Sequence, residues 1–507
     1  MLDVGAWNFS PPQQYPPDPK APVYPQPPPN HHLRPSFAPF ARPVPPFPTE
    51  QGALLQFELK KSPRRANILC AGQNIFKTVS NDYLNAKMFT ANRERLASLL
   101  PPRSLAVLNT NDIPPTNADG SLPLVVNSDL FYLTGVEQEQ SILLLNPDAE
   151  DANHREILFL REASPENELW EGHKLTKAEA RELTGIQTIF WLPEFPRLFH
   201  RLMCAAEHVY LNTNEHNRAV VEVASRDARF IAETKKNYPL HDYRRLATLL
   251  YQLRVVKSEA EIALIQKACD VTRAAFERVL KFTRPGVAEY EIEAEYAHEF
   301  IRHRCTFAYS PIIASGLNAC CLHYNVNAAT CRAGELLLLD VAAASRNYNS
   351  DLTRTIPVSG RFTPRQKKIY NAVLRVMRSA TAALRPGKTP REWQKESEQL
   401  MEKELVDLGL LTVRDIKKQS PASPAVKKYF MHGIGHPLGL AVHDVVPPYQ
   451  PIQAGWVLTV EPGIYIPEEK LAVRLENNVL VTETGTVDLM ARIPVEIADI
   501  EAHMRKK

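Results

Sequence analysis

The sequence lacks any run of apolar residues long enough to cross a membrane. No stretch of its 507 residues approaches the roughly 18 consecutive apolar residues that a spanning helix needs. An excess of one charge is also missing, because 60 Lys and Arg nearly balance 57 Asp and Glu and leave a net charge of +3. Composition gives no indication of a membrane or a nucleic acid as a partner, and we expect neither.

Cysteine is scarce and irregularly placed. The chain has seven cysteines, an odd number without regular spacing, which argues against a disulfide framework and favours a reducing compartment. We therefore expect a cytoplasmic protein. Cys320 and Cys321 stand beside His323, but no second cysteine pair completes a zinc site, so we do not expect a thiolate-bound metal there.

The first 50 residues lack the composition of a folded core. Sixteen of the 42 prolines lie between Pro11 and Pro48, a pattern typical of polyproline II segments. The segment also lacks the apolar stretch of a secretory signal and the Arg/Ser-rich pattern of an organellar presequence. A disordered tail is favoured over a ligand for aromatic-lined grooves. A third interpretation is that residues 1–87 are an extension that is not usually translated, with Met88 as the start.

Residues 88–240 alternate short apolar runs with amphipathic segments. Residues 92–100 are a predicted helix, and four segments are predicted strands: 104–112, 130–135, 140–147 and 155–162. Such alternation predicts an α/β domain with its own sheet. This domain carries no set of metal ligands of its own.

Residues 241–507 contain an internal repeat. A predicted helix over 256–282 opens with a capping box of Ser258 and Glu261, stops at residues 284–286 (Arg-Pro-Gly) and is followed by a second helix. The same order returns later: helix 369–384, Arg-Pro-Gly at 385–387, then helix 391–409. We expect two related α/β halves about a pseudo-two-fold axis. The alternative is two unrelated helical hairpins that share a common stop signal.

Four carboxylates and several histidines stand at strand ends or glycine-rich turns in the last third of the chain. The apolar run 336–339 leads into Asp340, and Asp351 follows just ahead of residues 352–355. For residues 336–355 alone, an equally weighted alternative is a strand-turn-strand unit in which both aspartates are solvated. Further along, His436 lies in a glycine-rich segment, Glu461 ends a short β-like run, and Glu476 lies in the middle of a predicted strand over 471–482.

These five side chains have the chemistry of a dinuclear metal site. Four carboxylates and an imidazole suit Mn(II), Co(II) or Zn(II), and four negative charges balance two divalent cations. Without metal the clustered carboxylates would repel one another and take up protons. Two ions about 3.5 Å apart can share a bridging hydroxide and polarise a substrate carbonyl.

In their order and spacing, these five residues resemble the metal ligands of the pita-bread metallopeptidase family, which includes aminopeptidase P, prolidase and methionine aminopeptidase. Residues 321–327, 350–366 and 431–444 carry further similarity, and residues 127–135 and 168–175 favour aminopeptidase P. The resemblance implies an α/β (α+β) fold in three parts. A Pro-rich extension over 1–87 precedes a smaller α/β domain over 88–240 and a pita-bread catalytic domain over 241–507.

The resemblance also implies a role for each ligand. Asp340 would chelate one metal, and His436 and Glu461 would hold the other. Asp351 and Glu476 would bridge both. Glu461 is the implied general base, taking a proton from the bridging water and passing it to the leaving nitrogen.

Six more residues have implied roles at the site. His323 and His443 would steady the tetrahedral intermediate and the substrate carbonyl, and without the resemblance structural histidines are the favoured interpretation. His432 and Arg474 would border the leaving side. Asp112 would lie near the amino end of the substrate, and Trp170 would reach toward the site of a neighbouring subunit; a packing aromatic is the alternative for Trp170.

We therefore predict a metal-dependent aminopeptidase that releases the N-terminal residue from peptides with proline in the second position. It would use two divalent ions, Mn(II) first and Co(II) or Zn(II) as alternatives, and form a homo-oligomer, a dimer or a tetramer. Prolidase activity and a metal-free peptide-binding or protein-binding module are the alternatives. Three places depart from the family pattern: Val125-Val126, residues 342–344 (three alanines) and Asn477-Asn478. The two asparagines put metal affinity and pH optimum in doubt.

Overall fold

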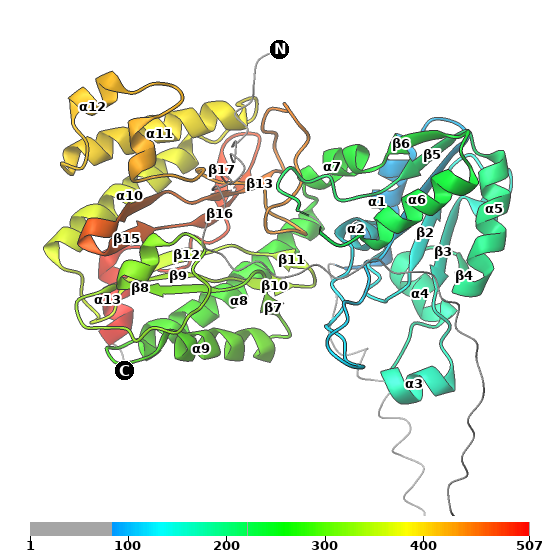
Figure 1. Cartoon of the computed structure of the whole chain (residues 1–507), viewed down its shortest axis with the longest axis horizontal. Coiled ribbons are helices and arrows are strands. Elements are labelled where there is room, and N and C mark those ends of the chain that lie inside the picture. The colour runs from blue at the N-terminus through cyan, green and yellow to red at the C-terminus, as the bar shows by residue number, and fades with distance from the viewer. Residues whose placement is uncertain (1–83, 221, 506–507) are drawn as a thin grey trace, which may run out of the picture. The chain divides into compact units, whose positions relative to one another are not determined.

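The computed structural model describes residues 84–220 and 222–505 (Figure 1). They belong to one compact unit, residues 79–507. The predictions for the Pro-rich extension over 1–87 fall outside the described ranges up to residue 83, whereas residues 86 and 87 already belong to the helix α1 (Ala86–Ala97). Within those ranges no helix is both long and apolar enough to cross a membrane.

The first part of the described chain is a six-stranded mixed sheet in the order β4-β3-β2-β1-β5-β6. Its strands are β1 (Ser104–Asn109), β2 (Ile142–Leu145), β3 (Glu156–Leu160), β4 (Thr188–Trp191), β5 (His208–Leu211) and β6 (Asp242–Arg245). Its helices are α1 (Ala86–Ala97), α2 (Ser128–Thr134), α3 (Pro165–Glu171), α4 (Lys177–Thr184), α5 (Phe195–Ala205) and α6 (Arg226–Asn237).

Strand alternation divides the core of this sheet between its two faces. Leu105 and Val107 pack with residues of α5 and α6, whereas Ala106 and Leu108 pack with residues of α1, α2 and α4. Helices therefore cover both faces, as expected for an α/β domain. The predicted strands in β1, β2 and β3 are confirmed.

The predicted strand over 130–135 is wrong, because this segment is the helix α2. The Asn127 side chain caps the helix by accepting the backbone N–H groups of Asp129 and Leu130, and Gly135 ends it at φ 69°. Residues 129–134 are all buried. A short helix that is buried on every side shows no 3.6-residue periodicity, so its apolar run is easily taken for a strand.

The second part of the described chain is built on two helix pairs. The first pair is α8 (Glu259–Phe282) and α9 (Glu289–Arg302), and the second is α10 (Pro364–Ala383) and α11 (Pro390–Asp407). The predicted capping box of Ser258 and Glu261 starts α8. Three further helices complete this part: α7 (Ala247–Val255), α12 (Val413–Lys418) and α13 (Ile497–Arg505).

Small antiparallel sheets lie between these helix pairs (Figure 1). In one, β9 (Leu336–Asp340) lies between β8 (Ile312–Ser315) and β12 (Thr353–Pro357). In another, β16 (Asn477–Val481) lies between β13 (Val457–Val460) and β17 (Thr486–Asp488). The others pair β14 (Gly463–Ile466) with β15 (Leu471–Arg474), and β10 (Ala343–Ser345) with β7 (Thr306–Phe307) and β11 (Tyr348–Asn349).

Equivalent hydrogen bonds confirm the internal repeat. After the first Arg-Pro-Gly, Cys331 O accepts the Gly286 N–H at 2.9 Å and Cys331 N–H donates to Val287 O at 2.9 Å. After the second, Ile452 O accepts the Gly387 N–H at 2.9 Å and Ile452 N–H donates to Lys388 O at 2.8 Å. Asp340 lies nine residues after Cys331 (340 − 331), and Glu461 lies nine after Ile452 (461 − 452). The two carboxylates thus hold matching positions in the two halves.

The single strand predicted over 471–482 is also wrong. The chain pairs with β14 as far as Arg474 and then with β13 from Asn477 onward, so two strands replace one. Between them, Leu475 N–H donates to Pro462 O at 3.2 Å and Glu476 N–H donates to Thr353 O at 3.0 Å. Glu476 consequently lies where two sheets meet, not in mid-strand.

A buried ionic network joins the two parts of the described chain. Arg254 donates to Asp129 Oδ1 at 2.7 Å and to Asp444 Oδ1 at 2.6 Å, and Lys257 donates to Asp444 Oδ2 at 3.0 Å. Asn212 holds the other oxygen of Asp129 at 2.9 Å. Burial alone would raise the pKa of Asp444, but the two cations hold that pKa below its usual value. Asp444 directly follows the predicted site residue His443.

We expect Asp444→Asn to lower the free energy of unfolding by about 3 kcal/mol, because it leaves two buried cations without a full counter-charge. Urea denaturation of the purified protein measures this loss. Asp242, whose side chain is 49% exposed and pairs at the surface with His208 and Arg244, provides the matched control, and Asp242→Asn should lower the free energy of unfolding by less than about 1 kcal/mol. Equal midpoints for the wild type and both variants would contradict the structural importance of the network.

Candidate active site

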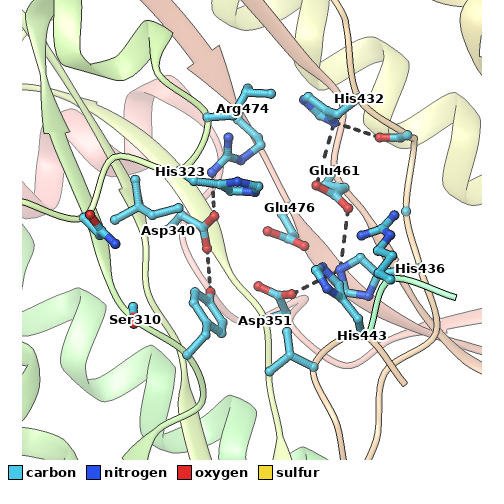
Figure 2. Close-up of a pocket in the computed structure, with 18 residues that line it drawn as sticks. Ser310, His323, Asp340, Asp351, His432, His436, His443, Glu461, Arg474 and Glu476 are labelled. Carbon is cyan, nitrogen blue, oxygen red and sulfur yellow. Dashed lines mark hydrogen bonds and ion pairs between the residues drawn. The ribbon is translucent and has the colours of Figure 1, made fainter. Parts of the chain in front are cut away.

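A pocket of about 400 Å³ is lined mostly by the second part of the described chain, where side chains from several separate segments meet (Figure 2). Its lining includes all five predicted metal ligands and four of the other predicted site residues: Asp340, Asp351, His436, Glu461, Glu476, His323, His432, His443 and Arg474. The fold thus brings residues as far apart in the sequence as His323 and Glu476 (476 − 323 = 153) to the same pocket.

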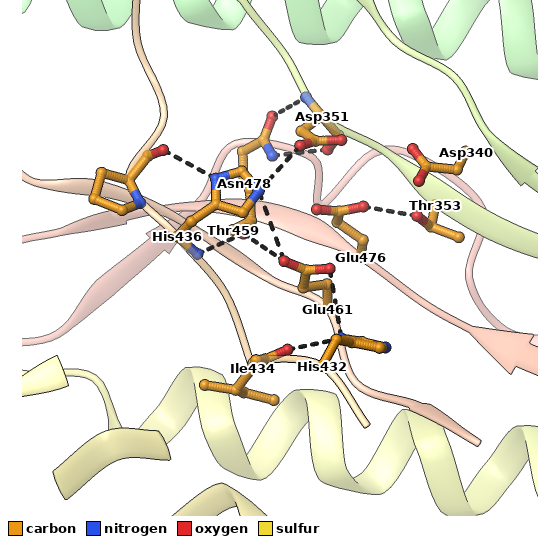
Figure 3. A network of polar contacts seen from close by, with 12 residues as sticks. Asp340, Asp351, Thr353, His432, Ile434, His436, Thr459, Glu461, Glu476 and Asn478 are labelled. Atoms are coloured by element: carbon orange, nitrogen blue, oxygen red, sulfur yellow. Dashed lines mark hydrogen bonds and ion pairs between the residues drawn. The ribbon is translucent and has the colours of Figure 1, made fainter. Parts of the chain in front are cut away.

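Strand ends position the carboxylates. Asp340 ends β9, Asp351 precedes β12, and Glu461 follows β13. His436 Nε2 lies 3.4 Å from Asp351 Oδ2 and 3.6 Å from Glu461 Oε1. One donor atom from each of Asp351, His436 and Glu476 lies within 4.8 Å of the others. These side chains point toward one another in Figure 3.

Neighbouring groups fix the orientation of these donors. His436 Nδ1 is 3.0 Å from Pro437 O, which leaves Nε2 directed at the carboxylates. Thr353 Oγ1 donates to Glu476 Oε2 at 2.7 Å. Asn478 accepts the Asp351 N–H at 3.0 Å and donates to Asp351 O at 2.7 Å (Figure 3). Asn478, a departure from the family pattern, therefore anchors the backbone of Asp351, because an amide accepts and donates at once whereas an ionised carboxylate only accepts.

The cluster binds protons when no metal compensates its charge. Burial raises the pKa of Glu461 to about 7, and the carboxylates of Asp351 and Asp340 add to this rise against the opposing charge of His436. Burial and the neighbouring carboxylates also raise the pKa of Glu476 well above its usual value. Burial opposes the charge on His436, but Asp351 and Glu461 still raise its pKa to about 9. Buried oxygen donors beside one imidazole fit a divalent cation.

Metal binding should therefore release protons, because the donors coordinate only in their deprotonated forms. At pH 7 we expect more than about one proton per chain, from His436 and partly from Glu461. Apparent metal affinity should rise with pH until about pH 9, the pKa of His436, and level off above it. Calorimetric titration with Mn(II) in buffers of different ionisation enthalpy measures the release. Heats that do not depend on the buffer would contradict it.

Asp340 is held by two neighbours on the far side of the pocket. Tyr309 Oη donates to Asp340 Oδ1 at 2.6 Å, and Arg474 Nη2 donates to Asp340 Oδ2 at 2.5 Å. Arg474 also donates to Tyr465 Oη at 2.8 Å, and His432 Nε2 is 2.9 Å from the same oxygen. The buried Tyr465 hydroxyl thus links Arg474 to His432.

Burial keeps two of the pocket histidines neutral near pH 7. It lowers the pKa of His432 to about 3, with the charge of Arg474 as the next contribution. Burial likewise lowers the pKa of His443 to about 4, followed by the charge of His436. The His443 ring lies edge-on to the His436 ring at 4.3 Å between centroids. Neutral imidazoles here can donate or accept a hydrogen bond without adding charge.

Two predicted substrate residues lie outside the pocket lining of this chain. The Asp112 carboxylate accepts two hydrogen bonds from Arg229, at 2.8 and 3.0 Å. Trp170 is 81% exposed on the short helix α3. Their assignments stay predictions. Cys320 and Cys321 are free thiols, and the Cys320 thiol donates to Leu471 O.

Sequence reasoning missed several residues that line the pocket: Arg218, Tyr309, Ser310, Ile312, Leu322, Asn325 and Val442. Tyr309 and Ser310 precede β8, and nothing in their local sequence indicates contact with Asp340. Arg218 comes from the loop after β5, in the first part of the described chain. Only the three-dimensional arrangement identifies it.

Comparison with known proteins bears on both parts of the chain. Residues 263–483 match metallopeptidase family M24, and residues 89–210 match the N-terminal domain of aminopeptidase P. The Xaa-Pro aminopeptidase of Escherichia coli (strain K12) is 33% identical over 438 residues, which are 83% of this chain and 98% of that relative.

Solved structures agree with this similarity. Pseudomonas aeruginosa aminopeptidase PepP matches with a TM-score of 0.74 and 31% identity, covering 83% of this chain and 98% of that one. Zinc-substituted E. coli aminopeptidase P in complex with product matches with a TM-score of 0.74 and 31% identity, covering 85% and 100%.

The fold and these relatives together define a metal-dependent exopeptidase with a pita-bread catalytic domain. The chain belongs to the aminopeptidase P family of M24 metallopeptidases. The predicted family and fold class are confirmed.

Proposed function

We propose that this chain is a dinuclear-metal aminopeptidase that releases the N-terminal residue from peptides with proline in the second position. The observation that carries the proposal is the convergence of Asp340, Asp351, His436, Glu461 and Glu476 on one pocket. Membership in the aminopeptidase P family supports the choice of substrate. An X-Pro bond is a tertiary amide without an N–H donor, and the residue before proline is conformationally restricted, so its cleavage calls for a dedicated pocket.

The five residues would hold two divalent ions. Asp340 would serve one ion, His436 and Glu461 the other, and Asp351 and Glu476 both. When bound, such ions supply Lewis acidity, which polarises a carbonyl and lowers the pKa of water. Mn(II) is the proposed native metal, because four oxygen donors and one nitrogen suit it, with Co(II) or Zn(II) as alternatives.

The protein's own groups would then move the proton and position the peptide. Glu461 would accept a proton from the attacking water and deliver it to the proline nitrogen as the bond breaks. Neutral His443, together with His323, would donate hydrogen bonds to the oxyanion that forms on the substrate carbonyl. His432 and Arg474, linked through Tyr465, would border the leaving peptide.

Further details of the proposal concern the molecule in the cell. A homo-oligomer, either a dimer or a tetramer, would allow Trp170 to approach the site of a neighbouring subunit, and its exposure is compatible with such a contact. A cytoplasmic location follows from the irregular cysteines of the sequence. Light scattering during size-exclusion chromatography measures the oligomeric state.

Two peptides test the activity. Purified protein with Mn(II) should release arginine from Arg-Pro-Pro and should act more slowly on Gly-Pro. Cleavage of the dipeptide alone would reassign the protein as a prolidase. Absence of cleavage, combined with metal analysis that finds no bound Mn, Co or Zn after reconstitution, would instead identify a metal-free peptide-binding or protein-binding module.

A further inference from the structure

Arg218 is the pocket residue that comes from the first part of the described chain. Every other described lining residue lies between Tyr309 and Glu476. Arg218 belongs to the loop between β5 and α6, so the sheet domain contributes a cation to the pocket that holds the proposed catalytic groups. No role for this arginine follows from the proposed chemistry.

The loop that carries Arg218 is anchored. Arg218 N–H donates to His216 Nδ1 at 3.2 Å, and Ala219 N–H donates to His216 O at 2.8 Å. The neighbouring Glu215 accepts hydrogen bonds from Arg245 of β6 at 3.0 and 2.8 Å. These contacts make residues 216–219 a hydrogen-bonded turn and tie the preceding Glu215 to β6.

The guanidinium of Arg218 has no counter-charge within the described residues. Arg229 pairs with Asp112 and Arg245 pairs with Glu215, whereas the structure records no ion pair for Arg218 in residues 84–220 and 222–505. Its charge reaches into the site, because it contributes, after burial and His436, to the lowered pKa of His443. Arg218 is exposed and lies at the edge of the pocket, where a cation without an ion pair can attract and bind an anion.

The pocket itself offers no spare anion. Its four carboxylates are Asp340, Asp351, Glu461 and Glu476, all proposed metal ligands, and Asp340 already pairs with Arg474. With two divalent ions their charge would be neutralised. A counter-ion for Arg218 would therefore have to arrive with the substrate.

We propose that Arg218 binds a carboxylate of the peptide substrate and selects peptides that present one near the cleaved bond. The inference rests on the proposed function and deepens it. A carboxylate can come from the C-terminus of a short peptide or from an acidic side chain. Arginine suits either source, because its planar guanidinium forms paired hydrogen bonds with a carboxylate.

Matched peptides separate the two sources. Ala-Pro-Ala and its C-terminal amide differ only in the terminal carboxylate. Ala-Pro-Glu amide and Glu-Pro-Ala amide restore a carboxylate on a side chain. For the wild type we expect kcat/KM to be about tenfold higher for at least one carboxylate-bearing peptide than for Ala-Pro-Ala amide, mostly through KM, with the advantage shrinking at high ionic strength.

The Arg218→Gln variant should lose this preference and still cleave Ala-Pro-Ala amide at the wild-type rate. Arg218→Lys should restore part of it, since it keeps the charge but loses the planar donor pair. Arg197→Gln is the matched control, because Arg197 lies on α5 of the same sheet domain, its side chain is 81% exposed, and it does not line the pocket. That variant should keep the full preference.

Binding provides a readout that does not depend on turnover. Calorimetry should show that Pro-Ala binds the wild type about tenfold more tightly than Pro-Ala amide if the C-terminal carboxylate is the ligand, and Arg218→Gln should remove the difference. If the wild type cleaves Ala-Pro-Ala amide as efficiently as the carboxylate-bearing peptides, the role of Arg218 is overturned. The same holds if Arg218→Gln keeps the preference for a carboxylate. Either result leaves the proposed function standing. Failure to cleave any of the peptides would overturn this role together with the proposed function.

Discussion

The Asp351→Ala variant is expected to lose more than about a thousandfold in kcat with Mn(II) present, because this carboxylate is proposed to contact both ions. Its position supports a large effect. Asp351 Oδ2 lies 3.4 Å from His436 Nε2, and an Asp351 oxygen lies within 4.8 Å of a Glu476 oxygen. The backbone of Asp351 is anchored by Asn478. The other described carboxylates that line the pocket, Asp340, Glu461 and Glu476, are all proposed ligands themselves.

The same variant should lose the stabilisation that metal provides. If the dissociation constant for Mn(II) rises by about a hundredfold, about 2.7 kcal/mol of ligand-linked stability disappears at saturating metal. The measurement is the rise in Tm on adding Mn(II), which should be large for the wild type and small for Asp351→Ala. Asp407→Ala, at an exposed position at the end of α11, should match the wild type. Normal turnover by Asp351→Ala would refute the bridging role.

The Glu461→Gln variant is expected to lose about a thousandfold in kcat with little change in KM, because the amide can still occupy the position but cannot accept a proton. The surroundings of Glu461 should be preserved. Its backbone N–H donates to Ile434 O at 2.8 Å and would do so equally in the variant. Steady-state kinetics on Arg-Pro-Pro give the split between kcat and KM.

Glu483→Gln is the control for this experiment. Glu483 is an exposed residue in the turn after β16 and does not line the pocket, so its substitution should leave both constants unchanged. A kcat for Glu461→Gln within tenfold of the wild type would assign the proton transfer to another group. Metal analysis of the variant distinguishes loss of the base from loss of the ion.

The large features of the fold could be predicted because local signals and tertiary structure agree. The capping box at Ser258, the amphipathic face of α8 and the recurring Arg-Pro-Gly stops all act over a few residues. The apolar run before Asp340 is likewise a strand by composition alone. The structure adds that Asp340 and Glu461 hold matching positions in the two halves, as the backbone hydrogen bonds of Cys331 and Ile452 show.

The errors arose where tertiary structure overrides local sequence. The segment 130–135 is apolar throughout because α2 is buried on all sides, and burial erased the periodicity that marks a helix. The break at Glu476 depends on the separate partners β14 and β13, which no local pattern reveals.

Pocket residues without a motif were also beyond sequence reasoning. Tyr309 reaches Asp340 across 31 positions, and Arg218 approaches from a different domain. Neither stands at a spacing that indicates a shared site. Residues that act through charge or a single hydrogen bond, and not through a repeated pattern, become visible only when the chain is folded.

Anomalous scattering from crystals soaked in Mn(II) tests the central claim most directly, because it locates the ions and their donors together. The account predicts two adjacent peaks in the pocket, surrounded by Asp340, Asp351, His436, Glu461 and Glu476. No peak at this pocket, or peaks that these five side chains do not contact, would contradict it.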